Sequence, residues 1–311
     1  MNKLVCIAGP TASGKTALAV SLARGLDGEV VSCDSMQVYR RMNIGTAKPT
    51  PAEMQGVVHH MLDVAEPWED FSVSRYCAMA TPIVEDILAR GKTAIIAGGT
   101  GLYMDSLVRG GGFAPFPATG VREALERQAD AVGMDAMLEQ LRQVDPESAA
   151  RLHPADRKRI LRALEVYRET GATITEHNRR TQAVPPKFSP VWIGLDFARR
   201  ETLYARIDLR VEQMLELGLM AEIQALLDEG IPPKATALQA IGYKEFVRAL
   251  SGEETVAQAG ARVQQASRRY AKRQLTWFRR NPAIHWLMRD GYRTDAEILA
   301  AARQLLQETD K

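Results

Sequence analysis

The first residues that could carry chemistry form a glycine-rich loop near the start of the chain. The run Gly9-Pro10-Thr11-Ala12-Ser13-Gly14-Lys15-Thr16 has the spacing of a phosphate-binding loop. In such a loop the backbone N–H groups surround a phosphate, Lys15 pairs with its outer oxygens and the Thr16 hydroxyl can hold Mg²⁺. We therefore expect all eight residues to bind a polyphosphate, with Lys15 also taking part in catalysis and Thr16 in metal binding.

Asp34 is the second candidate, because it follows the apolar run at residues 30–33. In a parallel sheet this position lies at the carboxyl edge, beside the phosphate-binding loop. Two functional roles fit the carboxylate: a partner of Mg²⁺, or a base that accepts a proton from an attacking nucleophile. The structural alternative is an N-cap for residues 36–39.

A second glycine-rich turn, Gly98-Gly99-Thr100-Gly101, follows another apolar run. Its amides and the Thr100 hydroxyl could approach a diphosphate or a nucleobase, although many such turns need glycine only for backbone reasons. The pair His59-His60 does not predict a metal site, because neighbouring residues of a strand point to opposite faces.

The basic residues are concentrated in one segment near the carboxyl end. Residues 262–280 contain no acidic residue and seven basic ones, namely Arg262, Arg268, Arg269, Lys272, Arg273, Arg279 and Arg280, although the whole chain carries only +2. On a helix, four of these side chains fall within about 40° of one another, namely Arg262, Arg269, Arg273 and Arg280. This basic helix is typical of nucleic-acid backbone binding. A solvated basic face is the alternative. Residues 157–162 form a second basic run.

The spacing of apolar runs predicts how these residues are positioned. Strand-like runs at residues 4–8, 29–33, 93–97 and 191–195, with helical patterns between the first pairs, indicate an α/β fold. We predict a parallel, P-loop NTPase-like sheet flanked by helices, formed by residues 1–115 and 189–311 and including the basic helix. Residues 116–188 have helical periodicity and a Pro-rich end, which predicts an inserted helical subdomain.

Composition narrows the class of protein. The chain has 311 residues, of which 46% are hydrophobic and 25% charged, as in an ordinary globular protein. No apolar run approaches the roughly 20 residues of a membrane span, and no signal-peptide core is visible, so we expect a cytoplasmic protein without membrane contact. The three cysteines are scattered, which supports neither a disulfide framework nor a zinc site.

Together these motifs make the chain resemble the bacterial tRNA dimethylallyltransferases. The resemblance covers nearly the whole chain. It rests on the phosphate-binding loop and on Asp34-Ser35-Met36-Gln37-Val38-Tyr39, Gly45-Thr46-Ala47-Lys48-Pro49, His59-His60, Gly98-Gly99-Thr100-Gly101-Leu102-Tyr103, Arg162-Ala163-Leu164-Glu165, Ile241-Gly242-Tyr243 and Lys272-Arg273-Gln274-Leu275-Thr276-Trp277.

The resemblance implies transfer of a dimethylallyl group from dimethylallyl diphosphate to the exocyclic N6 amine of the adenosine 3′-adjacent to the anticodon of tRNA. It implies Mg²⁺ as cofactor, the anticodon stem-loop as partner, and Asp34, Lys15 and Thr100 as catalytic residues; no protein partner is implied. The tRNA-binding residues expected from the resemblance and from the basic helix are Asp34, Ser35, Met36, Gln37, Thr100, Arg122, Lys158, Arg159, Ile160, Leu161, Arg162, Gln239, Ala240, Ile241, Gly242, Tyr243, Lys244, Arg269 and Arg273.

Two other functions share the phosphate-binding loop. A small-molecule kinase would also have an inserted lid, but it has no need for the basic helix. An RNA-binding regulator without transferase chemistry would not need Asp34 and the Thr100 turn beside the loop.

Overall fold

The computed structural model describes residues 4–110 and 119–309. The chain divides into two compact units. The core unit comprises Met1–Gly111 and Lys187–Lys311, and the helical unit comprises Gly112–Pro186. The predicted domain boundary at residue 115 lies outside the described residues.

A parallel sheet forms the centre of the core unit, which confirms the predicted fold class. Six strands in the described part of the chain pair in the order β3-β2-β4-β1-β5-β6, every neighbour parallel. They are β1 (Leu4–Ala8), β2 (Gly28–Ser32), β3 (His59–His60), β4 (Thr93–Ala97), β5 (Val191–Asp196) and β6 (Ile284–Met288). The central strands are apolar and rich in Val and Ile because helices cover them on both faces.

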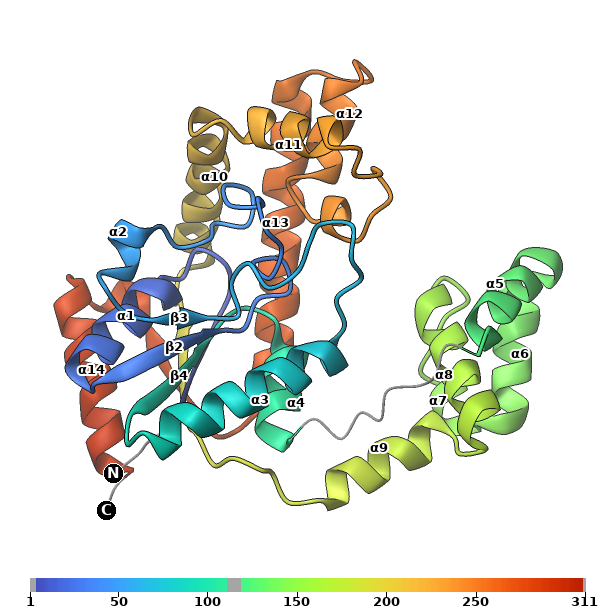
Figure 1. Ribbon diagram of the computed structural model, residues 1–311, viewed down its shortest axis with the longest axis horizontal. Helices are drawn as coiled ribbons and strands as arrows, with labels where there is room; N and C mark the ends of the chain where they lie inside the picture. Colours follow the sequence, from blue (N-terminus) through green and yellow to red (C-terminus); the bar gives the residue numbers. More distant parts are fainter. Residues whose placement is uncertain (1–3, 111–118, 310–311) are drawn as a thin grey trace. The chain divides into compact units, whose positions relative to one another are not determined.

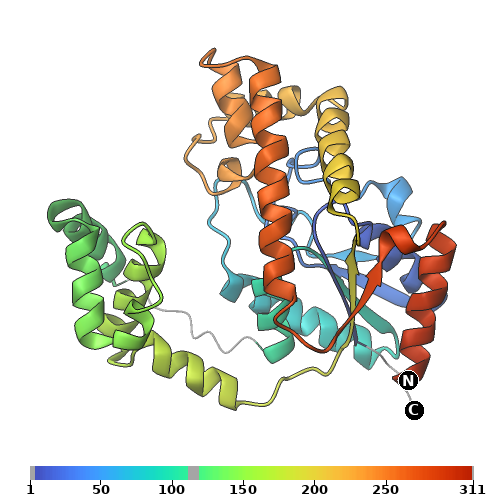
Figure 2. The ribbon, with the colours of Figure 1, turned by 180° about the vertical axis from the view of Figure 1, so that it is seen from behind.

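The helices on the two faces bury these strands. Helices α1 (Lys15–Gly25) and α14 (Asp295–Glu308) cover one face, and α3 (Val73–Ala89) and α4 (Gly101–Arg109) cover the other (Figures 1 and 2). The core on the α1 side joins apolar side chains of the sheet to those of both helices, among them Ile7, Ile95, Ile193, Leu22 and Ile298. A short helix, α2 (Pro51–Met54), precedes β3.

Further helices of the core unit gather beyond the carboxyl edge of the sheet, where the phosphate-binding loop lies (Figure 1). They are α10 (Arg200–Glu216), α11 (Leu219–Asp228), α12 (Lys244–Leu250) and α13 (Val256–Phe278), with 3₁₀ turns η1 (Ala237–Gln239) and η2 (Arg289–Gly291). Ala12 of the loop packs with Leu203 and Ile207 of α10 and with Ala271 and Leu275 of α13. This cluster fixes both helices against the loop.

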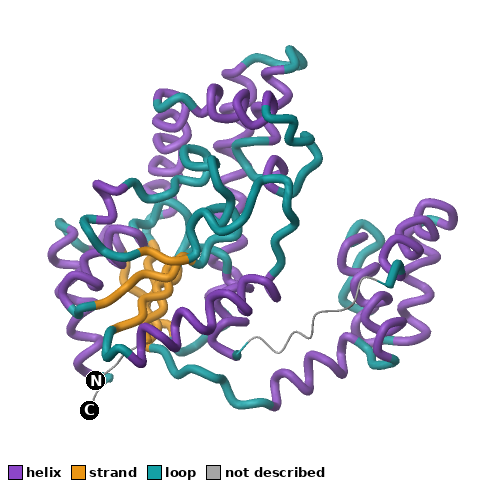
Figure 3. The backbone as a smooth tube through the Cα atoms, viewed as in Figure 1, coloured by secondary structure: helices purple, strands orange, loops and turns teal. Residues whose placement is uncertain are grey.

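The helical unit contains no strand among its described residues (Figure 3). It consists of α5 (Val121–Val132), α6 (Met134–Val144), α7 (Pro146–Ala149), α8 (Arg157–Thr170) and α9 (Ile174–Ala183). Its own core includes Leu125, Leu141 and Ile160. In both units together, the described helices include none that is long and apolar enough to cross a membrane.

Candidate active site

The glycine-rich loop connects β1 to the start of α1, which is the context that a phosphate-binding loop requires. Gly14 stands at the N-cap of α1 with φ 92°, and Gly9 has φ 147°. A Cβ atom on Gly9 would lie 2.5 Å from the Leu195 carbonyl oxygen, so no larger residue fits. The loop therefore lies close against β5, with its N–H groups at the amino end of a helix, where anions are stabilised.

Lys15 is partly buried beside this loop, and its Nζ donates a hydrogen bond to the Pro10 carbonyl oxygen at 2.7 Å. Burial, together with the charge of the neighbouring Arg210 and against the opposing effect of Asp34, lowers the pKa of Lys15 to about 7. An anion bound in the loop would supply the negative charge that favours the protonated amine.

Asp34 lies directly beyond β2, at the sheet edge where the sequence places it. Its Oδ1 accepts hydrogen bonds from the N–H groups of Met36, at 2.8 Å, and Gln37, at 3.3 Å. Burial raises the pKa of Asp34, while these two bonds and the charges of Lys15 and Arg210 oppose the rise. Residues 35–38 form turns and not the helix expected as a structural alternative, so Asp34 caps a turn while lining the site.

Two cavities meet at Asp34. The smaller, about 90 Å³, is polar and is lined by Lys15, Thr16, Gly98 and Gly99 among others. The larger, about 380 Å³, extends between α10, α13 and the segment 236–244. The residues that line both are Thr11, Asp34, Thr46, Ala47, Arg210 and Tyr270. A diphosphate-sized site and a larger site thus share one carboxylate.

Arg210 and Gln274 belong to the site but were not predicted. Arg210 of α10 lines both cavities. Gln274 of α13 is buried; its Oε1 accepts from the Thr11 N–H at 2.8 Å and its Nε2 donates to the Gly99 carbonyl oxygen at 2.9 Å. It therefore joins the two glycine-rich turns. In the sequence, Gln274 stands within the family motif at residues 272–277 but was assigned no role, and Arg210 stands in none of the motifs.

Thr100 contacts the loop that starts at Asp34. Its Oγ1 accepts from the Ser35 N–H at 3.0 Å and donates to the Ser35 Oγ at 3.3 Å. Thr100 therefore holds the residue next to Asp34, and the smaller cavity is lined by its neighbours Gly98 and Gly99.

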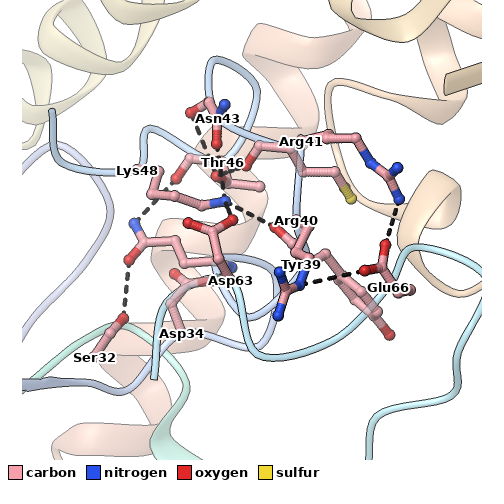
Figure 4. A network of polar contacts seen from close by, with 12 residues as sticks. Ser32, Asp34, Tyr39, Arg40, Arg41, Asn43, Thr46, Lys48, Asp63 and Glu66 are labelled. Atoms are coloured by element: carbon pink, nitrogen blue, oxygen red, sulfur yellow. Dashed lines mark hydrogen bonds and ion pairs between the residues drawn. The ribbon is translucent and has the colours of Figure 1, made fainter. Parts of the chain in front are cut away.

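Lys48 closes the loop that runs from Asp34 to Lys48. Its side chain is only 5% exposed. The Nζ donates to the Tyr39 carbonyl oxygen at 2.7 Å, to Asn43 Oδ1 at 2.9 Å and to Asp63 Oδ1 at 2.6 Å. Figure 4 shows Lys48 among these acceptors, with Asp34 at the other end of the loop. The motif residue Lys48 is therefore a structural cation that shapes the loop.

The Gln37 side chain also stabilises this loop through hydrogen bonds. Its Nε2 donates to the carbonyl oxygens of Thr46 and Ala47, both at 3.2 Å, and its Oε1 accepts from the Ser32 hydroxyl at 2.9 Å. These bonds tie the wall of the cavities to the end of β2. Met36 and Ser35 line the larger cavity, as does Asp34.

The basic helix is partly neutralised by acids from other elements, which the sequence count did not reveal. Three of its cations form ion pairs: Arg262 with Glu254, Arg268 with Asp208, and Arg279 with Asp196. Within the described residues, Arg269 and Arg273 form no ion pair, and both are exposed. The Arg273 guanidinium lies 5.5 Å from the centre of the Tyr270 ring. The surface that carries unpaired positive charge is therefore smaller than the seven basic residues suggest.

The predicted RNA contacts from the helical unit differ in accessibility. Ile160 and Leu161 are buried in the core of that unit, so the prediction that they contact RNA is wrong for their side chains. They lie on the inner face of α8, whereas Lys158 and Arg159 are exposed. Arg122 and Arg162 are both paired with Glu165.

The segment 239–244 lies against the larger cavity, which is lined by Gln239, Ala240, Ile241, Gly242 and Lys244. Tyr243 is the exception. It is fully buried, so its predicted contact with RNA is wrong for the side chain.

Comparison with known proteins gives a consistent result. Residues 37–281 match the family described as IPP transferase. A tRNA dimethylallyltransferase of Caldanaerobacter subterraneus subsp. tengcongensis is 45% identical over 298 residues, covering 95% of each chain. The solved full-length tRNA isopentenylpyrophosphate transferase of Bacillus halodurans has TM-score 0.73 and 41% identity, covering 100% of this chain and 98% of its own. A eukaryotic dimethylallyltransferase, captured acting on tRNA, has TM-score 0.83 and 30% identity, covering 100% of this chain and 79% of its own.

Proposed function

This chain belongs to the IPP transferase family, and we propose that the two joined cavities beside Asp34 are its active site. The enzyme transfers a dimethylallyl group from dimethylallyl diphosphate to the exocyclic N6 amine of the adenosine 3′-adjacent to the anticodon in tRNA, and it releases diphosphate. The observation that supports this proposal most directly is that the cavity at the phosphate-binding loop and the larger cavity share one carboxylate, that of Asp34. The relatives support this transfer and not the small-molecule kinase.

The smaller cavity suits the diphosphate. The loop amides and the cations Lys15 and Arg210 would stabilise the negative charge that develops as the allylic C–O bond breaks. The family reaction uses a divalent metal, and Thr16 lines the same polar cavity as Lys15. We infer that the Thr16 hydroxyl would help to hold Mg²⁺ in this cavity, where the ion would supply further charge neutralisation on the leaving group.

The larger cavity suits the reacting carbon and the adenine. The apolar side chains of Ile207, Val211, Met214 and Val263 line it, and they would exclude water from the allylic cation. As the adenine nitrogen forms its bond to the allylic carbon, the electrons of the C–O bond leave with the diphosphate. The N6 proton passes to Asp34, because the amine nitrogen becomes acidic as its lone pair forms the new bond.

The tRNA would reach this site along the exposed cations. Arg269 and Arg273 of the basic helix would contact phosphates, as would Lys158 and Arg159 of the helical unit. The target base must leave the stack of the anticodon loop to enter the cavity, at a cost of a few kcal/mol that pocket contacts repay.

One labelling experiment tests the function. The enzyme is incubated with unmodified tRNA and either radiolabelled dimethylallyl diphosphate or γ-labelled ATP, and acid-precipitable label is counted. We expect label in the tRNA only from dimethylallyl diphosphate. Label transferred from ATP would indicate a kinase, and no transfer from either donor would indicate an RNA-binding protein without this chemistry.

A further inference from the structure

Two irregular segments form parts of the wall of the larger cavity. One is Gly45–Ala47, from the loop after β2, and the other is Ala240–Gly242, after η1. Neither is part of a regular helix or strand, and each is held locally by turn bonds, such as Ala47 N–H to the Ile44 carbonyl oxygen and Tyr243 N–H to the Ala240 carbonyl oxygen. Both are held by one carboxylate, that of Glu222 on α11, which is not among the residues that line the cavity.

Glu222 accepts four hydrogen bonds. Its Oε2 accepts from the N–H groups of Asn43 and Ile44, each at 2.8 Å. Its Oε1 accepts from the Gly45 N–H at 3.1 Å and from the Tyr243 hydroxyl at 2.6 Å. The carboxylate thus binds the amide of Gly45, the two amides that precede the first segment, and the side chain of the residue that follows the second segment.

Gly45 and Tyr243 also touch directly. A Cβ atom on Gly45 would lie 2.4 Å from the Cε2 atom of the Tyr243 ring, so only glycine allows this approach. Burial and the neighbouring Glu222 raise the pKa of Tyr243 well above its usual value, which keeps the hydroxyl protonated as a donor. The ring and the carboxylate therefore fix the separation of the two segments from the side away from the cavity.

We propose that Glu222 is a positioning residue that fixes the relative position of these two wall segments, and thereby the shape of the part of the active site that receives the acceptor base. This rests on the proposed function, in which the adenine enters the larger cavity. The phosphate-binding loop is held by other contacts, namely the Lys15–Pro10 and Gln274–Thr11 bonds and the packing of Gly9. Loosening Glu222 should therefore weaken productive binding of tRNA and leave the binding of dimethylallyl diphosphate nearly unchanged.

The test compares steady-state constants of three variants. Glu222→Gln replaces one acceptor oxygen by an NH₂ donor that would face the N–H or O–H groups now bound to it. We therefore expect KM for tRNA to rise about tenfold, and KM for dimethylallyl diphosphate to change less than about twofold. Tyr243→Phe removes one of the four bonds and should raise KM for tRNA by a smaller factor. Glu229→Gln is the matched control, because Glu229 pairs with the Arg41 side chain of the same loop at 3.0 Å but does not bind its amides; both KM values should stay unchanged.

The outcomes separate this proposal from the proposed function. A merely structural role would lower the active fraction, and hence kcat, while leaving both KM values unchanged. That result, or an equal rise of both KM values in Glu222→Gln or Tyr243→Phe, would overturn the positioning role. If Glu222→Gln does not fold, Tyr243→Phe alone decides. Failure of the parent enzyme to transfer label to tRNA would instead overturn the proposed function.

Discussion

The basic helix gives a quantitative prediction about salt. Arg269 and Arg273 lie one turn apart on α13, are exposed and have no carboxylate partner among the described residues. The double variant Arg269→Gln/Arg273→Gln keeps helix propensity but removes two phosphate contacts. Each contact contributes about 0.7 to 0.9 to the slope of log affinity against log salt, so the slope should become shallower by about 1.6. The affinity deficit of the variant should then be about ninefold larger at roughly 50 mM salt than at roughly 200 mM.

The structure supplies a matched control on the same helix. Arg262→Gln/Arg268→Gln changes the net charge equally, but these arginines are already paired with Glu254 and Asp208. Its slope should change much less. The assay is equilibrium binding of tRNA to parent and variants across a salt series. Equal slopes for all three proteins would refute the reasoning, because the basic helix would then be a solvated surface.

Two further predictions concern charged residues whose pKa the fold lowers. Lys15→Ala should lower turnover about 100-fold, because one charge contact to the leaving group is lost. Burial lowers the pKa of Lys15 to about 7, so its charge is lost as pH rises through that value; diphosphate affinity measured from pH 6 to 8 should fall with pH more steeply for the parent than for Lys15→Ala. Glu29 of β2 is 5% exposed and bonded to Arg90, Lys92 and His60. The Arg90 bonds, helped by His60 and Lys92, hold the pKa of Glu29 well below its usual value. Its stabilisation is therefore present above the unfolded pKa of about 4.3 and is lost as pH falls below it. Glu29→Gln should reduce the free energy of unfolding by about 3 kcal/mol at neutral pH, a difference that denaturant titrations should find smaller below pH 4, and an equal loss at both pH values would contradict the ionic role.

The sequence predicted the parts of the site whose signals are local. The phosphate-binding loop and Asp34 each follow an apolar strand directly, and in a parallel sheet the carboxyl ends of such strands meet at one edge. Gln274 and Arg210 reach the same edge from helices far along the chain; Gln274 bonds to Thr11 across 263 residues. No local spacing encodes such a contact.

The errors have a related cause. The family resemblance implies RNA contacts for whole runs of residues, which include Ile160, Leu161 and Tyr243, but the packing of the fold buries these three side chains. Similarly, the acids that neutralise Arg268 and Arg279, Asp208 and Asp196, lie on α10 and β5. A count of charges along one segment cannot reveal partners that only the tertiary fold brings near.

The role of Asp34 is the central claim, and Asp34→Asn tests it most directly. The asparagine carbonyl can still accept the Met36 and Gln37 N–H bonds, so the turn should persist, but an amide is far too weak a base to take the N6 proton. The measurement is the single-turnover rate of transfer with saturating tRNA and dimethylallyl diphosphate, together with the dissociation constants of both substrates. We expect the rate to fall about 100-fold or more while both dissociation constants stay within a few-fold of the parent. A rate within a few-fold of the parent would contradict the account, because Asp34 would then only cap the turn or contact the metal, and another group would accept the proton.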